Sequence, residues 1–327
     1  MRDDARPVRR FWRSTAGVVA AACVAVSVTG LFAYFSHSEN AYIVRLASFA
    51  PALIVVSVAG AVLAALGRRW IVLVAALAAV ATGGALFGPL YIPNASADAG
   101  GRTIRVMQAN LMLGLADSNA VAAFVREHDV DVLTVQELTF DAESALSAAG
   151  VDRALPYRFT RPTPGGGGGA GIYSRFPMSA ARELPDFVLS NLVADLDVGS
   201  EEPLRVYSVH PVPPYPTPST LWASEMELLL EEVQASATRP EVIVSGDFNS
   251  TRSHSRFRDI LAVGYEDAAD RTGSGLIATY PTDKPFPAVV GIDHVLTRGV
   301  TASSLQRITV PGSDHHGLIA EIALSSR

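Results

Sequence analysis

Short acid, histidine and asparagine motifs are spread over the C-terminal two-thirds of this 327-residue chain. Each places one or two polar residues directly after an apolar run rich in β-branched residues, which is typical of a strand end. They read Q-A-N-L at Asn110, V-Q-E-L at Glu137, V-H-P at His210, S-G-D-F-N at Asp247 and Asn249, G-I-D-H-V at Asp293, and G-S-D-H-H at Asp314 and His315. The pattern predicts metal ligands and a general base gathered at one rim of a sheet.

Glu137 is the first candidate metal ligand. It follows V-L-T-V, the end of an apolar run. Magnesium prefers hard oxygen ligands and takes few of them from protein, so a carboxylate at a strand tip suits it. A helix-cap partner or a surface acid would look the same in the sequence.

Asp247 and Asn249 form a D-x-N pair at the end of I-V-S-G. Residues two apart on an extended chain point to the same side. The acid can then orient an attacking water while the amide donates to a phosphoryl oxygen. The alternative is a plain turn, because D-x-N after glycine is common turn chemistry.

The histidines supply the acid–base chemistry. His315 beside a second carboxylate, Asp293, predicts a general base with its orienting acid. His210 ends the run L-R-V-Y-S-V, where an imidazole can donate to phosphoryl oxygens and stabilise developing charge. His294 and His316 are interpreted as supporting or surface residues.

Two unusual loops accompany these motifs. The proline-rich run at residues 211–218 is stiff and non-helical, and forms either a pocket wall or a rigid spacer. The glycine run Gly165–Gly169 cannot be regular structure. It is either a flexible lip of the site or a loose hairpin connection.

The elements that must position these residues alternate between strand and helix from Arg102 onward. Predicted strands are Ile104–Ala109, Val132–Val135, Ile172–Ser174, Leu192–Leu196, Leu204–Val209, Val242–Ser245, Ile292–Leu296 and Ile319–Ala323. Predicted helices are Asn119–Glu127, Leu221–Gln234 and His254–Ala262. This mixture predicts an α/β domain in which sheets lie between helices.

The N-terminal third predicts a membrane anchor. Three apolar stretches, Ser14–Phe35, Leu46–Leu66 and Trp70–Ile92, are each about 20 residues long, enough to cross a bilayer as a helix. The first is too long for a signal peptide. The predicted organisation is a basic cytoplasmic N-terminus at 1–13, three transmembrane helices within 14–92, a linker at 93–101 and a catalytic domain at 102–327.

Charge supports this division and orients it. Mean hydropathy is +0.26 and 18% of residues are charged, as suits a membrane protein. Positive residues favour the cytoplasmic side, so the Arg-rich start and the Arg68–Arg69 loop lie inside. Everything after Pro93 is then extracytoplasmic. Residues 101–327 hold 18 basic and 28 acidic residues, a poor footprint for nucleic acid. Cys23 is the only cysteine, which excludes an intrachain disulfide.

Taken in order, the motifs resemble the endonuclease/exonuclease/phosphatase superfamily over residues 102–327. The resemblance implies a DNase-I-like four-layer αββα sandwich with the site at one end. It also implies a role for each motif residue: Glu137 as the main Mg²⁺ ligand, Asn110 as its partner, Asp314 as the adjacent metal-side acid, His210 on the phosphate, Asp247 and Asn249 on water and phosphate, and Asp293 holding the base His315. Mn²⁺ is the alternative metal. Abasic-site nucleases have a tyrosine where this chain has His210, which argues against the DNA-repair branch.

The anchor and the run V-H-P-x-P-P-Y-P also resemble VanJ-type teicoplanin-resistance proteins. That resemblance implies a multi-pass membrane protein whose catalytic domain lies next to the bilayer. This domain would act on a phosphoryl bond in an envelope lipid or lipid-linked precursor. The alternative hypothesis is a membrane-anchored extracellular nuclease. A third is an inactive module that binds envelope precursors.

Overall fold

A computed structural model describes residues 5–94 and 102–325. The start of the predicted cytoplasmic segment (1–4) and most of the predicted linker (95–101) lie outside this part of the chain. The chain divides into two compact units. The first extends to Pro89 and includes Ser253–Ser255, and the second runs from Leu90 to Arg252 and from Arg256 onward. Each unit is described by itself.

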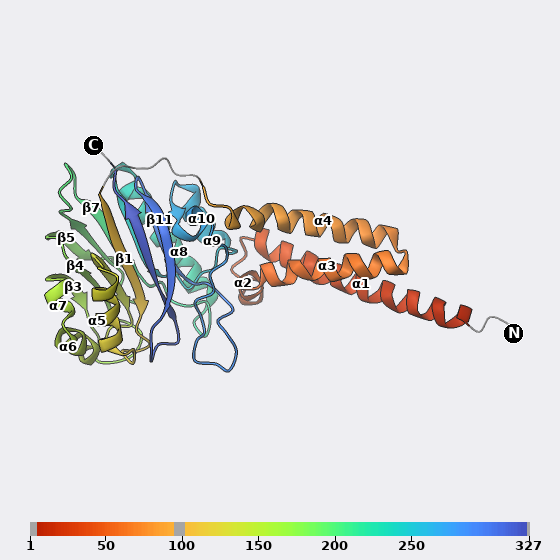
Figure 1. Ribbon diagram of the computed structural model, residues 1–327, viewed down its shortest axis with the longest axis horizontal. Helices are drawn as coiled ribbons and strands as arrows, with labels where there is room; N and C mark the ends of the chain where they lie inside the picture. Colours follow the sequence, from red (N-terminus) through yellow and green to blue (C-terminus); the bar gives the residue numbers. More distant parts are fainter. Residues whose placement is uncertain (1–4, 95–101, 326–327) are drawn as a thin grey trace. The chain divides into compact units, whose positions relative to one another are not determined.

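The N-terminal unit is helical (Figure 1). Its helices are α1 (Ala5–Phe35), α2 (Ala41–Ser48), α3 (Ala50–Gly67) and α4 (Trp70–Phe87), and the short 3-10 helix η1 (Gly88–Tyr91) follows α4. Three segments are long and apolar enough to cross a membrane: Trp12–Phe35, Ala50–Gly67 and Trp70–Tyr91. The three expected apolar helices are therefore present. Their orientation across a membrane stays a prediction.

The second apolar stretch differs from the sequence prediction. We expected one helix over Leu46–Leu66, but the chain breaks between α2 and α3 at Phe49, whose ψ is 7°. Pro51 occupies the first turn of α3. Because proline lacks an N–H and clashes with the preceding turn, it starts a new helix rather than continuing the old one.

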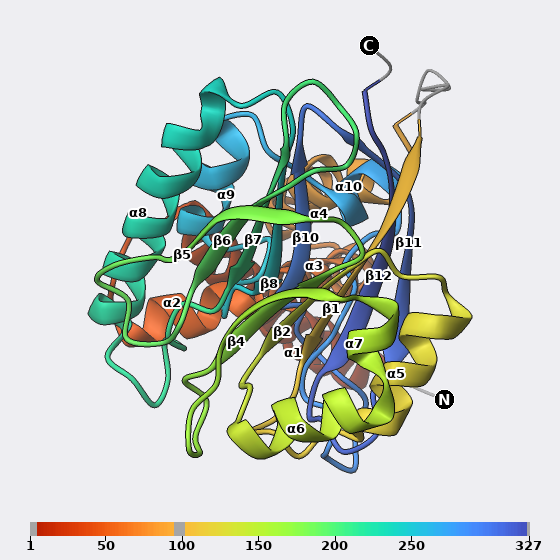
Figure 2. The same ribbon diagram turned by 90° about the vertical axis from the view of Figure 1, so that its left-hand side faces the viewer.

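The C-terminal unit is built on two six-stranded mixed sheets (Figure 2). The first, in the order β11-β12-β1-β2-β4-β3, contains β1 (Thr103–Asn110), β2 (Val132–Gln136), β3 (Tyr157–Arg161), β4 (Ala170–Ser174), β11 (Thr301–Thr309) and β12 (His316–Ala323). The second, in the order β5-β6-β7-β8-β10-β9, contains β5 (Met178–Glu183), β6 (Leu192–Leu196), β7 (Leu204–Val209), β8 (Val242–Asp247), β9 (Glu266–Asp267) and β10 (Asp293–Arg298).

Helices cover the outer faces and complete the predicted four-layer α/β sandwich. The helices of this unit are α5 (Ser118–Glu127), α6 (Phe140–Ala149), α7 (Val151–Ala154), α8 (Ser219–Ala235), α9 (Ser255–Ala262) and α10 (Ala268–Thr272). Val121 of α5 and Leu146 of α6 pack with Met107 and Leu133 on the outer face of the first sheet. Trp222 and Met226 bury the inner face of α8.

The core between the sheets follows from strand alternation. On β1, Ile104 and Val106 join the cluster that contains Val206 and Ile243 of the second sheet. Since side chains alternate along a strand, Gln108 and Asn110 must also point between the sheets. Polar side chains thus enter the inter-sheet space only toward the end of β1.

Strand directions bring the polar motifs to one end. β1 and β2 run parallel, as do β7 and β8, so Asn110 and Asp247 end their strands at the same rim. β10 runs antiparallel to β8, with Asp293 opposite Asp247. β12 is antiparallel to β1, which places His315, directly before β12, at that rim as well. The sheet-end arrangement predicted from the sequence is present.

Candidate active site

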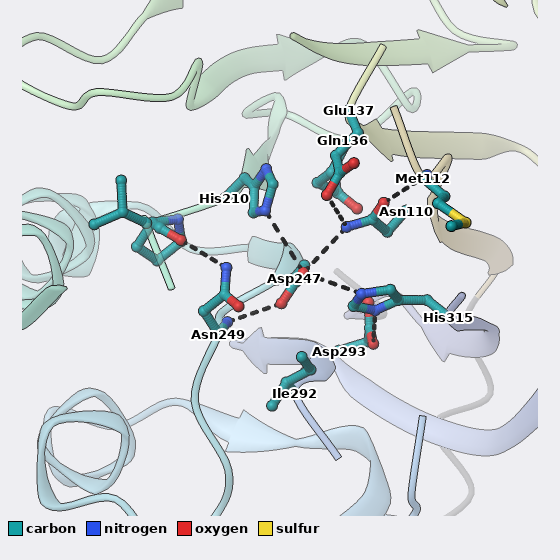
Figure 3. Close-up of polar contacts among 12 residues, drawn as sticks. Asn110, Met112, Gln136, Glu137, His210, Asp247, Asn249, Ile292, Asp293 and His315 are labelled. Atoms are coloured by element: carbon teal, nitrogen blue, oxygen red, sulfur yellow. Dashed lines mark hydrogen bonds and ion pairs between the residues drawn. The ribbon is translucent and has the colours of Figure 1, made fainter. Parts of the chain in front are cut away.

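Asp247 lies at the centre of a buried polar cluster (Figure 3). Its Oδ2 accepts from Asn110 Nδ2 at 3.1 Å. The Nε2 atoms of His210 and His315 lie 3.6 and 3.8 Å from the same oxygen. Oδ1 accepts from the backbone N–H of Asn249 at 2.8 Å. Four residues singled out from the sequence, Asn110, His210, Asn249 and His315, therefore meet around the Asp247 carboxylate.

His315 is held by the carboxylate predicted to orient it. Its Nδ1 lies 2.8 Å from Asp293 Oδ2, and the other oxygen of Asp293 accepts from Gln108 Nε2 at 2.7 Å. The ring of Tyr280 packs on the imidazole with centroids 4.8 Å apart. With Nδ1 tied to Asp293, Nε2 is the nitrogen that faces Asp247 and is left for proton transfer.

The buried charges shift one another's protonation. Burial disfavours a charged imidazole, but the negative charges of Asp293 and Asp247 outweigh it and raise the pKa of His315 to about 10. Burial and the neighbouring Asp293 raise the pKa of Asp247. Burial would also raise the pKa of Asp293, yet the charge and hydrogen bond of His315 lower it. Opposite shifts on adjacent carboxylates are typical of a functional site.

Glu137 stands next to this cluster at a strained backbone position, with φ of 59°. Its Oε1 accepts from Asn110 Nδ2 at 3.1 Å and its Oε2 from the Leu113 N–H at 2.6 Å. Asn110 Oδ1 accepts from the Met112 N–H. Asn110 thus bridges two carboxylates through its amide nitrogen. Acting as a metal ligand through its oxygen would require this amide to rotate.

Asp314 lies next to His315 at the edge of the cluster. Its Oδ1 lies 4.0 Å from His315 Nε2. Burial raises the pKa of Asp314, and the charge of Glu137 adds to the rise. The two acids therefore repel one another when both are ionised.

The donor set fits a divalent cation with oxygen ligands. Asn110 Nδ2 donates to both Glu137 and Asp247. Burial is the main cause of the raised pKa of Asp247 and of Asp314, and the charge of Glu137 adds to the rise at Asp314. Ligand atoms of Asp247, Asp293 and His315 also lie within 4.8 Å of one another. That trio differs from the predicted set of Glu137, Asn110 and Asp314. Since Asp293 and His315 are already paired, we favour the Glu137 side for the metal.

Asn249 corrects one expectation. β8 ends at Asp247 and the chain turns, so Asn249 has a φ of 48° rather than an extended conformation. Its N–H donates to the Asp247 side chain, which forms an Asx turn. This is the plain turn that the D-x-N pattern left open as the alternative. The side-chain amide donates to the Pro211 carbonyl at 2.9 Å. Asn249 reaches the site through this turn and ties it to the loop after His210.

His210 is positioned by a residue that sequence reasoning missed. The side chain of Asn191 accepts from the His210 N–H at 2.6 Å and donates to the His210 carbonyl at 3.2 Å. The buried Nδ1 of His210 has no hydrogen-bond partner among the described residues. Nε2 is therefore the nitrogen that faces the cluster. Asn191 gave one usable signal, its place directly before the strand Leu192–Leu196.

Two glutamines inside the quoted motifs were also missed. Gln108 Nε2 donates to Gln136 Oε1 at 2.9 Å, and Gln136 Nε2 donates to Ser208 Oγ at 3.1 Å. The bonds link the two sheets beneath the catalytic cluster. The sequence signal for Gln108 was the strand period of two, which places its side chain on the same face as Asn110.

The glycine run borders the site. A side chain at Gly167 would lie 3.4 Å from the Glu137 carboxyl carbon, and one at Gly169 would collide with the Leu138 carbonyl at 2.0 Å. Gly169 instead accepts from the Leu138 N–H at 3.0 Å. Its position agrees with the predicted lip of the site. Its mobility stays a prediction.

Comparison with known proteins follows this geometry. Residues 107–315 match the sequence profile described as the Endonuclease/Exonuclease/phosphatase family. No curated protein matches the chain. Similar solved structures include TDP2 from D. rerio with a single-stranded DNA product, at 18% identity and a TM-score of 0.54, covering 67% of this chain and 98% of that one.

Two further similar structures are named as phosphatases of different substrates. The 3' phosphatase NExo from Neisseria, bound to a product DNA hairpin, is 18% identical with a TM-score of 0.53 and covers 66% of this chain and 98% of that one. A mannosyl-6-phosphatase from Bacteroides thetaiotaomicron is 16% identical with a TM-score of 0.51, and the match covers 68% of this chain and 100% of that one. At these identities the likeness establishes the DNase-I-like fold alone.

Proposed function

Because this chain belongs to the endonuclease/exonuclease/phosphatase family, we propose that it is a metal-dependent phosphoester hydrolase acting on an envelope lipid. The substrate class is a lipid phosphate, pyrophosphate or phosphodiester at the extracytoplasmic face of the membrane. The observation that carries the hydrolase assignment is the Asp293–His315 pair, whose Nε2 faces Asp247 in a cluster of acids. The three long apolar helices support a lipid substrate.

The residues divide the reaction between them. His315 Nε2 removes a proton from a water that Asp247 orients, and Asp293 stabilises the resulting imidazolium. The water oxygen bonds to phosphorus as the bond from phosphorus to the leaving oxygen breaks. His210 Nε2 lies near the same Asp247 oxygen as His315 Nε2 and donates to a phosphoryl oxygen as negative charge develops there.

Glu137 and Asp314, with Asn110 after rotation of its amide, are the residues that would hold the cation. A bound divalent metal would supply positive charge to the phosphoryl oxygens and lower the pKa of nearby His315. We propose Mg²⁺, with Mn²⁺ as the alternative. Members of the family typically depend on divalent metals, and this acidic cluster fits that requirement.

A nuclease is the second candidate, because two of the similar structures were solved with DNA. The excess of 28 acidic over 18 basic residues in 101–327 weighs against it, since nucleic-acid binding draws on basic surfaces. A binding module without activity is the third. The assembled base, orienting acid and phosphate-facing histidine weigh against that reading.

The deciding experiment is phosphate release by the purified full chain with Mg²⁺, with Mn²⁺ and with EDTA. The substrates are lipid pyrophosphates, phosphodiester lipids and DNA. We expect metal-dependent turnover of a lipid that EDTA abolishes. Faster turnover of DNA would support the nuclease, and binding of folded protein to lipid without turnover would support the inactive module.

The orientation has its own test. Protease added to intact spheroplasts should digest the domain that follows residue 101, because it is proposed to lie outside the cytoplasm. Lysed cells provide the control for protease susceptibility. Complete protection in intact spheroplasts, with digestion after lysis, would place the domain in the cytoplasm.

A further inference from the structure

The site end of the catalytic domain carries its most exposed apolar side chains. Among the described residues from 103 onward, seven large apolar side chains are at least 48% exposed: Leu113, Leu115, Phe140, Val188, Tyr215, Phe286 and Val289. We refer to these seven as the apolar rim. Three more are exposed to a lesser degree, Tyr157 at 41%, Leu221 at 37% and Leu276 at 36%. The gathering of all seven at one end is the feature to be explained.

Strand register shows that the rim surrounds the catalytic cluster on several sides. Leu113 and Leu115 follow the end of β1, Phe140 begins α6 just after β2, and Tyr215 follows the end of β7. Val188 precedes β6, while Phe286 and Val289 precede β10. Because β6 and β10 run antiparallel to β7 and β8, their starts lie at the rim where β7 and β8 end. Tyr157 pairs with Ser174, at the opposite end of its sheet.

Hydrogen bonds fasten these loops to the site. The Leu113 N–H donates to Glu137, and the Thr282 N–H donates to the Asp314 carbonyl at 2.8 Å. Buried Glu225 of α8 accepts from the N–H groups of Val188 and Val212 at 2.9 and 2.7 Å. These hydrogen bonds hold the loops in fixed positions. The exposure of their apolar side chains to solvent is therefore a feature of the fold.

The loops that carry the rim hold few charges, among them Asp186, Asp283 and Lys284. Residues 111–116, 162–170, 211–218 and 285–292 total 31 positions without one acidic or basic residue. The 227 residues of 101–327 include 18 basic and 28 acidic ones. These loops hold one basic residue, Lys284, and are therefore unsuited to a nucleic-acid backbone, which requires cations.

We infer that the apolar rim docks on the surface of a lipid bilayer, so that the catalytic cluster opens at the level of the lipid head groups. This inference rests on the proposed function and specifies how its substrate is reached. A ring with members on several sides fits a flat interface better than it fits one bound chain. Aromatic side chains such as Tyr215 and Phe286 suit the membrane interface, and the same chain carries three helices of membrane-spanning length.

The position of Lys284 also favours a lipid bilayer as the partner of the rim. Lys284 is the only lysine in the chain and lies two residues before Phe286, with its Nζ 2.7 Å from Asp283. A lysine stem can lie along apolar surface while its ammonium stays at the head groups. The loop thus pairs an aromatic residue with a cation, as interfacial segments do.

A spectroscopic test is independent of turnover. Cys23, the only cysteine, is replaced by serine, and Phe286→Cys or Leu115→Cys then takes an environment-sensitive fluorophore. The full chain is placed in phosphatidylcholine–phosphatidylglycerol nanodiscs with or without nitroxide-labelled phosphatidylcholine. We expect quenching of both rim probes and much less quenching of the matched control Tyr157→Cys. Equal quenching at all three positions, or none at the rim, overturns the inference. Energy transfer between labelled copies without lipid quenching would assign the rim to a second copy of the chain.

A kinetic test separates the rim from the chemistry. The double variant Leu115→Ser/Phe286→Ser should lose about tenfold in turnover of a lipid phosphoester in nanodiscs. Its turnover of a water-soluble phosphoester in the same nanodiscs should not change, and Tyr157→Ser should affect neither. Equal loss on both substrates, or no loss on either, contradicts the inference. An unaltered chain that hydrolyses neither substrate contradicts the proposed function, while the quenching result still decides the rim.

Discussion

His315 and His294 each contact a carboxylate through Nδ1, and they differ in what the second ring nitrogen meets. His315 Nδ1 is 2.8 Å from Asp293, and His294 Nδ1 is 2.7 Å from Asp267. Both imidazoles are buried. Nε2 of His315 faces the Asp247 carboxylate, whereas Nε2 of His294 contacts the Ser250 carbonyl at 2.9 Å.

That difference assigns the two pairs opposite tasks. A carbonyl only accepts, so Nε2 of His294 must carry a proton, and Asp267 at Nδ1 favours the second one. Burial would lower the pKa of His294, but Asp267 raises it. Through Nε2 the His294 ring holds the Ser250 carbonyl next to Asn249, and Phe257 packs on this ring with centroids 4.2 Å apart. An Asp–His pair becomes a base only when its second nitrogen faces reactants.

The largest effect should follow from removing the base. His315→Ala should lower turnover by about 10⁴-fold, because it removes the imidazole that takes the proton of the attacking water. Steady-state phosphate release measures it, and circular dichroism verifies the fold. Turnover retained within about tenfold of the unaltered enzyme would place the base elsewhere.

Asp293→Asn should follow with a loss of about 10³-fold, since the amide no longer fixes the imidazole in the working tautomer. Metal affinity, measured by calorimetry, serves as the control and should change little if the metal lies on the Glu137 side. A large loss of metal binding would instead favour the Asp247, Asp293 and His315 trio as the metal site.

His294→Gln should have the opposite outcome, a large loss of stability with a small loss of turnover. Removing one partner of a buried pair leaves Asp267 uncompensated, so the unfolding free energy should fall by about 3 kcal/mol. Turnover at low temperature should fall only a few-fold, through the loosened Ser250 turn. Thermal denaturation and phosphate release on the same sample check both parts. A loss of turnover as large as that of Asp293→Asn would remove the distinction between the pairs.

The last prediction is a pH dependence of stability in EDTA. His315 has a pKa of about 10 in the folded chain against an ordinary 6.5, so the folded state binds more protons over that interval. Stability should therefore be full below about pH 6.5 and decline as pH rises toward about 10. The melting temperature of the metal-free chain measures this decline. His315→Gln should reduce it, leaving the contribution of His294, whose pKa is also raised.

The sequence predicted the strands at the centre of each sheet and missed those at the edges. β3 and β11 border the first sheet, and β5 and β9 border the second. None of the four was predicted. β3 and β5 are largely exposed, and exposed edge strands favour charged residues that resist aggregation. Hydrophobic patterning therefore had little to detect there, although it located the buried central strands.

The site was predictable to the extent that its residues come directly from strand ends. Asp247, His315 and Asp293 meet as expected because register brings their strand ends to one rim. Gln108 and Asn191 escaped because a buried amide reads as an ordinary polar residue until its partner across the fold is known. The turn at Asn249 was decided by the local hydrogen bond to Asp247 rather than by strand periodicity.

The pairing of β1 with β12 has a consequence for how the protein is made. Thr103, at the start of β1, pairs with Ala323 near the end of β12. Such contacts between distant parts of the chain close slowly. During synthesis, β1 stays without its antiparallel neighbour until the ribosome has released β12. The enzyme should therefore remain inactive until β12 has been made, long after its apolar helices have left the ribosome.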